Sequence, residues 1–309
     1  MMKNKLVLFL LFLFAPCLSW GQSHSSNLIS RIDSLVKRYQ KSLEVPGLAV
    51  GLILDGKIVY KQAIGEQNLE TKAPLTERSL FHMASVSKPF VATAVMLLVE
   101  QGKINLDEKL TTYLPYFKMA DKRYSKITLR QMLQHSSGIP DVEDYGWTKS
   151  EKDAGAAERY IRTFKDSVLD FKPGKEFSYS NAAFDILADV IARASGMTFE
   201  AYMKKNIFEP VGMQNSTFYK PEVPSELATA PHWLDEELKM KVGEFYPYNR
   251  RHAPSSTLHS NVEDMLRWAQ FNLNQGSFEG KQIYQTSSYQ ALTQAQLPVW
   301  RKDSVCLSW

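Results

Sequence analysis

The chain has 309 residues, 44% of them hydrophobic and 12% aromatic, which is enough to bury the core of one large or two modest domains. Its formal net charge of +4 comes from scattered basic residues without a long Lys/Arg run, so the charge does not point to a nucleic-acid-binding protein. The two cysteines, Cys17 and Cys306, are too few for a disulfide framework or a cysteine-based metal site.

The first residues are typical of a secretory signal peptide. Two early lysines precede an apolar run, residues 6–14, and small residues follow it. A membrane span is the alternative, but this run is too short to cross a bilayer. We therefore predict a signal peptide at 1–21 and an exported chain at 22–309, periplasmic or secreted, without a transmembrane span. A lipid anchor on Cys17 is a minor alternative.

Periodicity after the leader predicts a helix and a hairpin. Apolar residues recur at helical spacing over 28–42. Two apolar strands are expected at 48–54 and 57–64, joined by a tight turn at Asp55-Gly56. Gly51 to Lys57 also fits G-x-x-x-x-G-K, but Ile follows the lysine and no helix begins there, so a nucleotide-binding loop is not expected.

Helices dominate the rest of the chain. Capping boxes at Thr128–Gln131 and Ser260–Glu263 open two of them. The other predicted helices are 87–101, 181–195 and one from Thr198 to Pro210. Together these elements predict an α+β fold, an antiparallel sheet with flanking helices and a helical subdomain at about 66–260.

One segment could supply a nucleophile and its base. Ser85-Val86-Ser87-Lys88 is an S-x-x-K at the expected start of a long apolar helix. Free N–H groups at a helix N-terminus favour an alkoxide or oxyanion, and residues i and i+3 share a face. Burial would lower the pKa of Lys88 and make a neutral amine base plausible. The alternative is an ordinary N-cap serine with a surface lysine.

The same motif recurs at Ser34-Leu35-Val36-Lys37, within the amphipathic helix. We expect this second copy to be a solvated helix face, so S-x-x-K alone is weak evidence of a catalytic site.

Tyr179-Ser180-Asn181 could supply a phenol and an amide to the same site. This Y-x-N lies in a loop just before a predicted helix. Close to Lys88, cationic neighbours would lower the pKa of the Tyr179 phenol enough for proton shuttling. The alternative is a buried aromatic residue beside an asparagine N-cap.

Four segments in one order resemble the serine β-lactamase-like family, which includes class C β-lactamases, D-Ala-D-Ala carboxypeptidases and related esterases. The resemblance extends from about Leu28 to the end of the chain, and its motifs are specific to the family but not to a substrate. The segments are L-x-V-P-G-L-A-V at 43–50, F-H-M-A-S-V-S-K at 81–88, I-T-L-R-Q-M-L-Q-H-S-S-G-I-P at 127–140 and P-G-K-x-F-x-Y-S-N at 173–181.

This resemblance implies roles for four residues. Ser85 would be the acylated nucleophile, Lys88 its base partner and Tyr179 a second proton-transfer group. Asn181 would bind the substrate amide or hold Lys88. Which group acts as acylation base is unsettled in such sites. No cofactor is implied.

The histidines are assigned to structure rather than chemistry. His135 stands in the H-S-S-G stretch, which resembles the family's helix-to-loop corner, and His82 is expected to pack in a strand. His232, His252 and His259 show no ligand spacing, so no metal is predicted.

Two departures from the family pattern stand out. Ser255-Ser256 occupies the position where family members usually carry a glycine pair, which puts a close backbone approach there in doubt. After Ser260 the chain contains neither the K-T-G nor the H-x-G that the resemblance implies on a strand lining the site. We therefore expect the chain to end before the last sheet strands, with Val305–Trp309 resembling the start of that final segment, and the activity of the 309-residue chain itself stays open.

The sequence thus predicts an exported serine hydrolase acting on an amide or ester, such as a β-lactam, a D-amino-acid peptide or a small ester, with possible peptidoglycan contact. The alternative is a non-catalytic peptidoglycan- or partner-binding module, or a decayed gene product, with the same fold.

Overall fold

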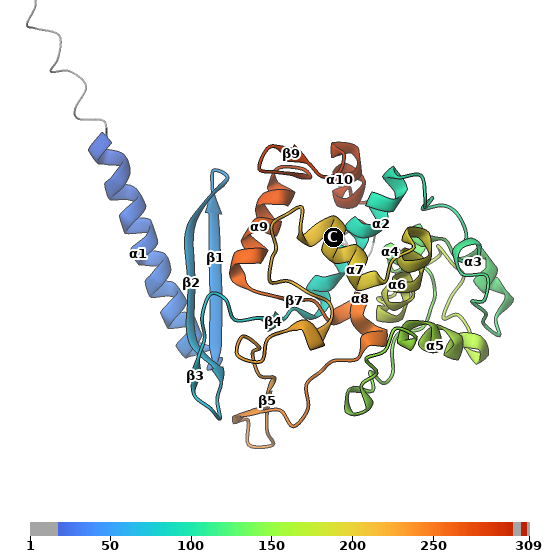
Figure 1. The fold of residues 1–309 in the computed structure, drawn as a ribbon, viewed down its shortest axis with the longest axis horizontal. Coiled ribbons are helices and arrows are strands. Elements are labelled where there is room, and N and C mark those ends of the chain that lie inside the picture. The colour runs from blue at the N-terminus through green and yellow to red at the C-terminus, as the bar shows by residue number, and fades with distance from the viewer. Residues whose placement is uncertain (1–17, 299–303, 308–309) are drawn as a thin grey trace, which may run out of the picture.

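The computed structural model describes residues 18–298 and 304–307. A three-stranded antiparallel sheet forms one side of the molecule, with the order β1 (Gly47–Leu54), β2 (Lys57–Asn68) and β3 (Ala73–Pro74). Helices α1 (Leu18–Ser42) and α9 (Val262–Leu273) pack on the sheet from opposite sides (Figure 1). The predicted α+β class with an antiparallel sheet is confirmed.

Most of the predicted leader, 1–21, lies outside the described residues, Cys17 included. Its last four residues belong to α1, which begins ten residues before the predicted start at 28. Among the side chains described from residue 28 onward, Val36 is buried against the sheet, whereas Leu35 and Tyr39 are exposed. The sheet therefore covers only part of the apolar face that the periodicity predicts.

The predicted hairpin is confirmed, with its turn at the expected residues and a second strand that runs four residues beyond the predicted end at 64. Asp55 and Gly56 both have positive φ, 49° and 75°, as the tight turn between two antiparallel strands requires. Gly51 is needed for packing rather than for phosphate binding, because a Cβ there would lie 2.7 Å from the Leu266 side chain of α9. The G-x-x-x-x-G-K pattern is thus a strand, a turn and the start of a second strand.

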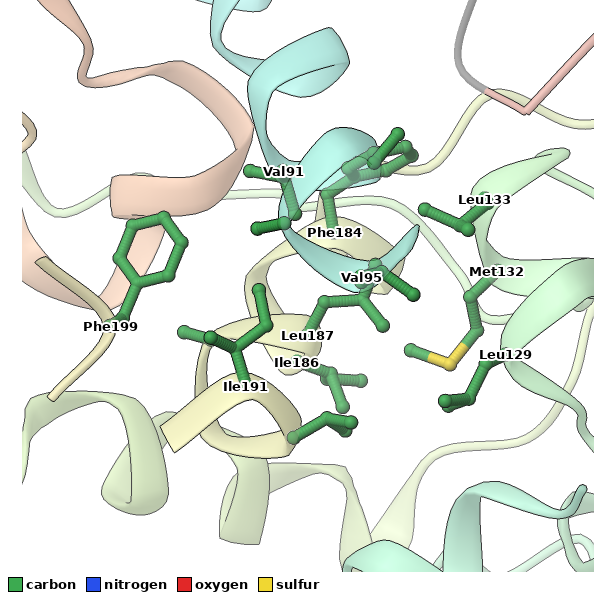
Figure 2. Close-up of a cluster of buried hydrophobic side chains, with 14 of the residues drawn as sticks. Val91, Val95, Leu129, Met132, Leu133, Phe184, Ile186, Leu187, Ile191 and Phe199 are labelled. Atoms are coloured by element: carbon green, nitrogen blue, oxygen red, sulfur yellow. The ribbon is translucent and has the colours of Figure 1, made fainter. Parts of the chain in front are cut away.

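The second part of the molecule is helical and is centred on α2 (Ser87–Glu100) and α6 (Asn181–Ser195). Figure 2 shows their apolar side chains interlocking, with Val91 and Val95 of α2 beside Phe184, Leu187 and Ile191 of α6. All five side chains are fully buried. This pair of helices is the rigid support of the site described below.

Shorter helices surround this pair (Figure 1). They are α3 (Leu110–Tyr113), α4 (Leu129–Leu133), α5 (Ala156–Thr163), α7 (Phe199–Met203), α8 (Ala253–Ser256) and α10 (Thr286–Thr293). The remaining strands form two-stranded antiparallel pairs: β4 (Phe81–His82) with β7 (His259–Ser260), β5 (His232–Leu234) with β6 (Met240–Val242), β8 (Ser277–Phe278) with β9 (Lys281–Gln282), and β10 (Leu297–Pro298) with β11 (Ser304–Val305).

Helix starts follow the predicted capping chemistry, with one exception. Thr128 and Gln131 form a complete capping box at α4, and Thr198 caps α7. At α9 the prediction is wrong by one residue, because the Asn261 side chain, not Ser260, accepts from the Asp264 N–H. Ser260 is instead the last residue of β7, and its hydroxyl meets that of Ser216 at 2.8 Å.

The short pair β4–β7 connects the two halves of the site. β4 leads directly into the Ser85 turn, and β7 follows α8. Met83 N–H donates to Leu258 O at 2.8 Å, and Leu258 N–H donates to Ser87 Oγ at 3.0 Å. Ser87, the second serine of the S-x-x-K segment, therefore anchors the start of α2 to the segment that precedes β7.

Within the described residues, no helix has both the length and the apolar character that a bilayer crossing needs. The limits of the helical subdomain at 66–260 and of the hydrolase domain at 22–309 stay predictions.

A core substitution tests the α2–α6 packing. Leu187→Ala deletes a fully buried side chain between the two helices and should lower the free energy of unfolding by about 2–5 kcal/mol. Urea unfolding measures the change. Leu273→Ala is the matched control, because Leu273 is 63% exposed and its loss should change stability by less than about 0.5 kcal/mol. Equal effects of the two changes would contradict the packing described.

Candidate active site

Ser85 lies in the middle of a 3₁₀ turn, Ala84–Val86, that runs directly into α2. It is exposed. The preceding residue, Ala84, has φ of 45°, a left-handed conformation that is strained for a residue with a side chain. The chain thus bends sharply before Ser85 and presents its hydroxyl to solvent at a helix N-terminus.

Lys88, one turn later, is buried, with 3% of its surface exposed. Its amine makes three hydrogen bonds: to Ser85 Oγ at 3.1 Å, to Asn181 Oδ1 at 2.7 Å and to Ser255 O at 2.8 Å. All three partners are uncharged, so no direct ion pair compensates the ammonium form. Burial lowers the pKa of Lys88 to about 8, against the opposing attraction of Asp185 and Asp141.

Tyr179 completes the contacts of the serine. Its hydroxyl donates to Ser85 Oγ at 2.9 Å, and the Lys88 amine lies 4.9 Å from the centre of its ring. The expectation that cationic neighbours lower the pKa of this phenol is wrong. Burial raises the pKa of Tyr179, with Asp141 and Asp185 adding to the rise, although the hydrogen bond with Ser85 opposes it. The lysine faces the ring and not the hydroxyl.

Asn181 bridges a cation and a carboxylate. Its Oδ1 accepts from Lys88, and its Nδ2 donates to Asp141 Oδ2 at 3.2 Å. Asp141 also accepts the backbone N–H of Asn181 at 2.6 Å. Because the two ends of the amide meet groups of opposite charge, its orientation is fixed. Of the two roles that the resemblance implied for Asn181, the structure contains the contact with Lys88.

His135 supports Tyr179 from behind. The two rings stack with centroids 4.3 Å apart, and His135 Nδ1 accepts the Ser180 N–H at 3.1 Å. Burial and the nearby Lys88 lower the pKa of His135 to about 3, so the imidazole is neutral. Its structural assignment agrees with these contacts.

The second S-x-x-K copy has a different environment. Ser34 Oγ donates to Ser30 O at 2.9 Å, and Lys37 pairs with Asp33 at 2.6 Å on the exposed face of α1. Ser34 and Lys37 make no hydrogen bond to each other in the described structure, as expected for a solvated helix face.

Sequence reasoning missed three groups behind Lys88. Ser255 presents its carbonyl to the amine, so a close backbone approach does occur despite the serine pair. Asp185 is fully buried and accepts from Ser255 N–H at 3.2 Å. His252 Nδ1 lies 2.6 Å from Asp185 Oδ2. The available signal was an aspartate on the apolar helix α6, four residues after Asn181 and so on the same face.

Among the described side chains, the remaining histidines form no set of metal ligands. His82 and His259 lie opposite each other in β4 and β7, with ring centroids 5.5 Å apart. The part of the chain that the structure describes contains no cluster of three or more His, Cys, Asp or Glu residues placed to hold a metal ion.

Comparison of folds places this architecture among penicillin-binding-protein-like structures. The octameric penicillin-binding protein homologue from Pyrococcus abyssi superposes with a TM-score of 0.77 at 25% sequence identity, over 91% of this chain and 64% of that one. The fold and its S-x-x-K serine site thus define a protein of the serine β-lactamase and penicillin-binding-protein class.

The chain belongs to the Beta-lactamase family, whose model matches residues 32–309. It is 26% identical to Protein flp of Staphylococcus aureus strain MW2 over 248 residues, 79% of this chain and 49% of that protein. It is 33% identical to Penicillin-binding protein 4* of Bacillus subtilis strain 168 over 176 residues, 55% of this chain and 38% of that protein. The chain thus spans half or less of the length of these curated relatives.

The neutral His135 predicts a loss of stability in acid. Its folded pKa, about 3, lies below the ordinary value of 6.5, so the unfolded chain binds the proton first. The stabilisation is complete above about pH 6.5 and falls by about 1.4 kcal/mol per pH unit as the pH drops toward 3. His82 and His259, with pKa values lowered by burial to about 4 and about 3, act in the same direction.

Thermal melts at pH 7 and pH 5 measure this effect. His135→Asn keeps an acceptor and tolerates the φ of 55° found there, so the variant should lose less stability between the two pH values than the wild type. His232→Asn is the comparison variant. Burial also lowers the pKa of His232, but this side chain is less buried, so the change should reduce the loss of stability by less than His135→Asn does. An unchanged pH dependence in His135→Asn would show that this imidazole is not the titrating group.

Proposed function

We propose that this protein is an exported serine hydrolase that cleaves an amide or ester through a Ser85 acyl-enzyme. One observation carries the proposal: a single exposed oxygen, Ser85 Oγ, is hydrogen-bonded both by the buried amine of Lys88 and by the hydroxyl of Tyr179. An ordinary N-cap serine with a surface lysine would place neither group there. The family membership supports the reaction class.

Acylation follows from this geometry. Ser85 Oγ attacks the carbonyl carbon as its proton passes to a neutral Lys88, and the C–O bond forms while the carbonyl oxygen takes up the negative charge. The free N–H groups at the start of α2 favour that charge. Collapse of the intermediate breaks the bond to the leaving group, which takes a proton from the Tyr179 hydroxyl. Lys88 then returns the Ser85 proton to Tyr179, for which its amine must turn from the ring face toward the hydroxyl.

In deacylation, water is the nucleophile and the oxygen of Ser85 is the leaving group. Water gives its proton to the same base, attacks the Ser85 ester and releases the acid, and Ser85 regains its proton. Asn181 keeps the amine directed at Ser85 during both steps. No cofactor is needed for either step.

The two proton-transfer groups differ in basicity, and this favours Lys88 as the first acceptor. With a pKa of about 8, about a tenth of the Lys88 amines are neutral at pH 7. Burial raises the pKa of Tyr179 above its ordinary value of 10, so this phenol keeps its proton at neutral pH. Tyr179 is therefore suited to donate to the leaving group.

The relatives narrow the substrate class. Two of the similar proteins are named for penicillin binding, which favours a β-lactam, or the D-amino-acid peptide that it resembles, over a small ester. Peptidoglycan contact and export, periplasmic or secreted, are part of this proposal and rest on the predicted signal peptide at 1–21.

Covalent labelling tests the nucleophile. The protein is incubated with a fluorescent penicillin or a fluorophosphonate, and the adduct is mapped by mass spectrometry. We expect a single adduct on Ser85 that Ser85→Ala abolishes. Ser34→Ala, the matched change in the second S-x-x-K, should label like the wild type. Labelling that survives Ser85→Ala would remove Ser85 from the mechanism, and no labelling at all would favour a non-catalytic binding module with this fold.

Rates of labelling test the two proton-transfer groups. Lys88→Ala and Tyr179→Phe should each slow acylation by about two to four orders of magnitude, the usual contribution of a positioned proton-transfer group. Stopped-flow fluorescence gives the rate, and circular dichroism shows whether the variants fold. Near-native rates in both variants, together with inactivity of His135→Ala, would replace this scheme with a histidine-based one.

A further inference from the structure

A fully buried carboxylate lies behind the Lys88 amine. Asp185, on α6, is 0% exposed, and both of its oxygens accept hydrogen bonds. Oδ1 accepts from Ser255 N–H at 3.2 Å, and Oδ2 lies 2.6 Å from His252 Nδ1. A buried carboxylate is costly unless its oxygens are satisfied, and here each oxygen has a hydrogen-bond partner.

The protonation of His252 follows from its other nitrogen. Arg251 Nε–H donates to His252 Nε2 at 2.9 Å. A guanidinium can only donate, so Nε2 carries no proton and the proton of the ring is on Nδ1. The contact between His252 and Asp185 is close enough for an ion pair, yet it joins a neutral imidazole to a carboxylate. The negative charge of Asp185 is therefore not cancelled by His252.

Ser255 connects this charge to the site. Its N–H donates to Asp185, and its carbonyl accepts from Lys88 at 2.8 Å. The same peptide segment is thus held by the carboxylate and holds the amine. His252 also fixes this segment, because its carbonyl accepts from the hydroxyls of Ser255 and Ser256, each at 3.2 Å.

Four titratable groups face Lys88, from α6, from the loop before α6 and from the loop after α4. Asp185 on α6 and Asp141 in the loop after α4 attract its ammonium form. Tyr179 and the neutral His135 add no negative charge at neutral pH. Of the two carboxylates, Asp141 is exposed and screened by water, whereas Asp185 is buried, where a charge acts at lower dielectric.

We propose that Asp185, held between His252 and the Ser255 N–H, is a positioning residue that aims the Ser255 carbonyl at the Lys88 amine and sets the pH range in which Lys88 serves as base. This proposal rests on the proposed function, in which Lys88 takes the Ser85 proton. Asp185 touches neither Ser85 nor the substrate and acts only through Lys88 and Ser255.

The isosteric change Asp185→Asn removes the charge and keeps the shape. Without the carboxylate, the ammonium form of Lys88 loses an attraction, so its pKa should fall below the wild-type value of about 8 by about one unit or more. Nuclear magnetic resonance of protein labelled with ¹³C,¹⁵N-lysine measures this titration, with the Lys88 signal assigned from Lys88→Arg. The acid limb of the pH profile for Ser85 acylation should move to lower pH by the same amount.

Asp189→Asn is the matched control. Asp189 lies one turn along the same helix but pairs with Arg193 and Tyr116, so its change should leave both the Lys88 titration and the acylation profile unchanged. A Lys88 titration that is the same in Asp185→Asn and in wild type would overturn the proposal. So would an equal shift in Asp189→Asn.

A measurement on the wild type covers the case in which Asp185→Asn does not fold. ¹⁵N chemical shifts of labelled histidine should show His252 as a neutral Nδ1–H imidazole at pH 7. A doubly protonated ring would cancel the charge of Asp185 and overturn the proposal. The Lys88 and His252 titrations are measured without any catalytic turnover. If Ser85 is not labelled, the proposed function is refuted, but these two titrations still decide the role of Asp185.

Discussion

The arrangement of this site depends mostly on the burial of the Lys88 amine. Lys88 lies at the start of an apolar helix whose packing excludes water, so its donors must be satisfied by protein atoms alone. Three segments distant in sequence meet this need: the Ser85 turn, the N-terminus of α6 and the α8 turn at Ser255. The β4–β7 pair and the α2–α6 core hold those segments in register. Satisfying the buried amine therefore also brings Ser85, Asn181 and Ser255 together around it.

Residues that cap helices or form tight turns made two helix starts and the hairpin predictable from the sequence. Capping residues marked the starts of α4 and α7, and the Asp55-Gly56 turn marked the hairpin. The spacing of Ser85 and Lys88 placed both on one helical face, and the structure joins them at 3.1 Å. The proximity of Tyr179 and Asn181 rested on resemblance, because nothing in their spacing from Ser85 implies contact. The same motif at Ser34 shows that spacing without a buried helix face is uninformative.

The rest could not be read from the sequence because it depends on tertiary packing. His252 meets Asp185 although the two are 67 positions apart in sequence, and the tautomer of His252 is set by its neighbour Arg251. The pKa of Tyr179 was misjudged because the direction of a shift depends on whether the cation approaches the hydroxyl or the ring. Capping at Asn261 rather than Ser260 has a similar origin, since pairing in β7 extends the chain through Ser260.

The three partners of Lys88 also determine where the lone pair of a neutral amine would point. Asn181 Oδ1 and Ser255 O are carbonyl oxygens, which can only accept hydrogen bonds. Ser85 Oγ is a hydroxyl and can either accept or donate. When the amine loses a proton, the two carbonyls keep the two remaining N–H bonds, and the lone pair is left facing Ser85. Of its three partners in the structure, a deprotonated Lys88 amine therefore directs its lone pair at the Ser85 hydroxyl alone.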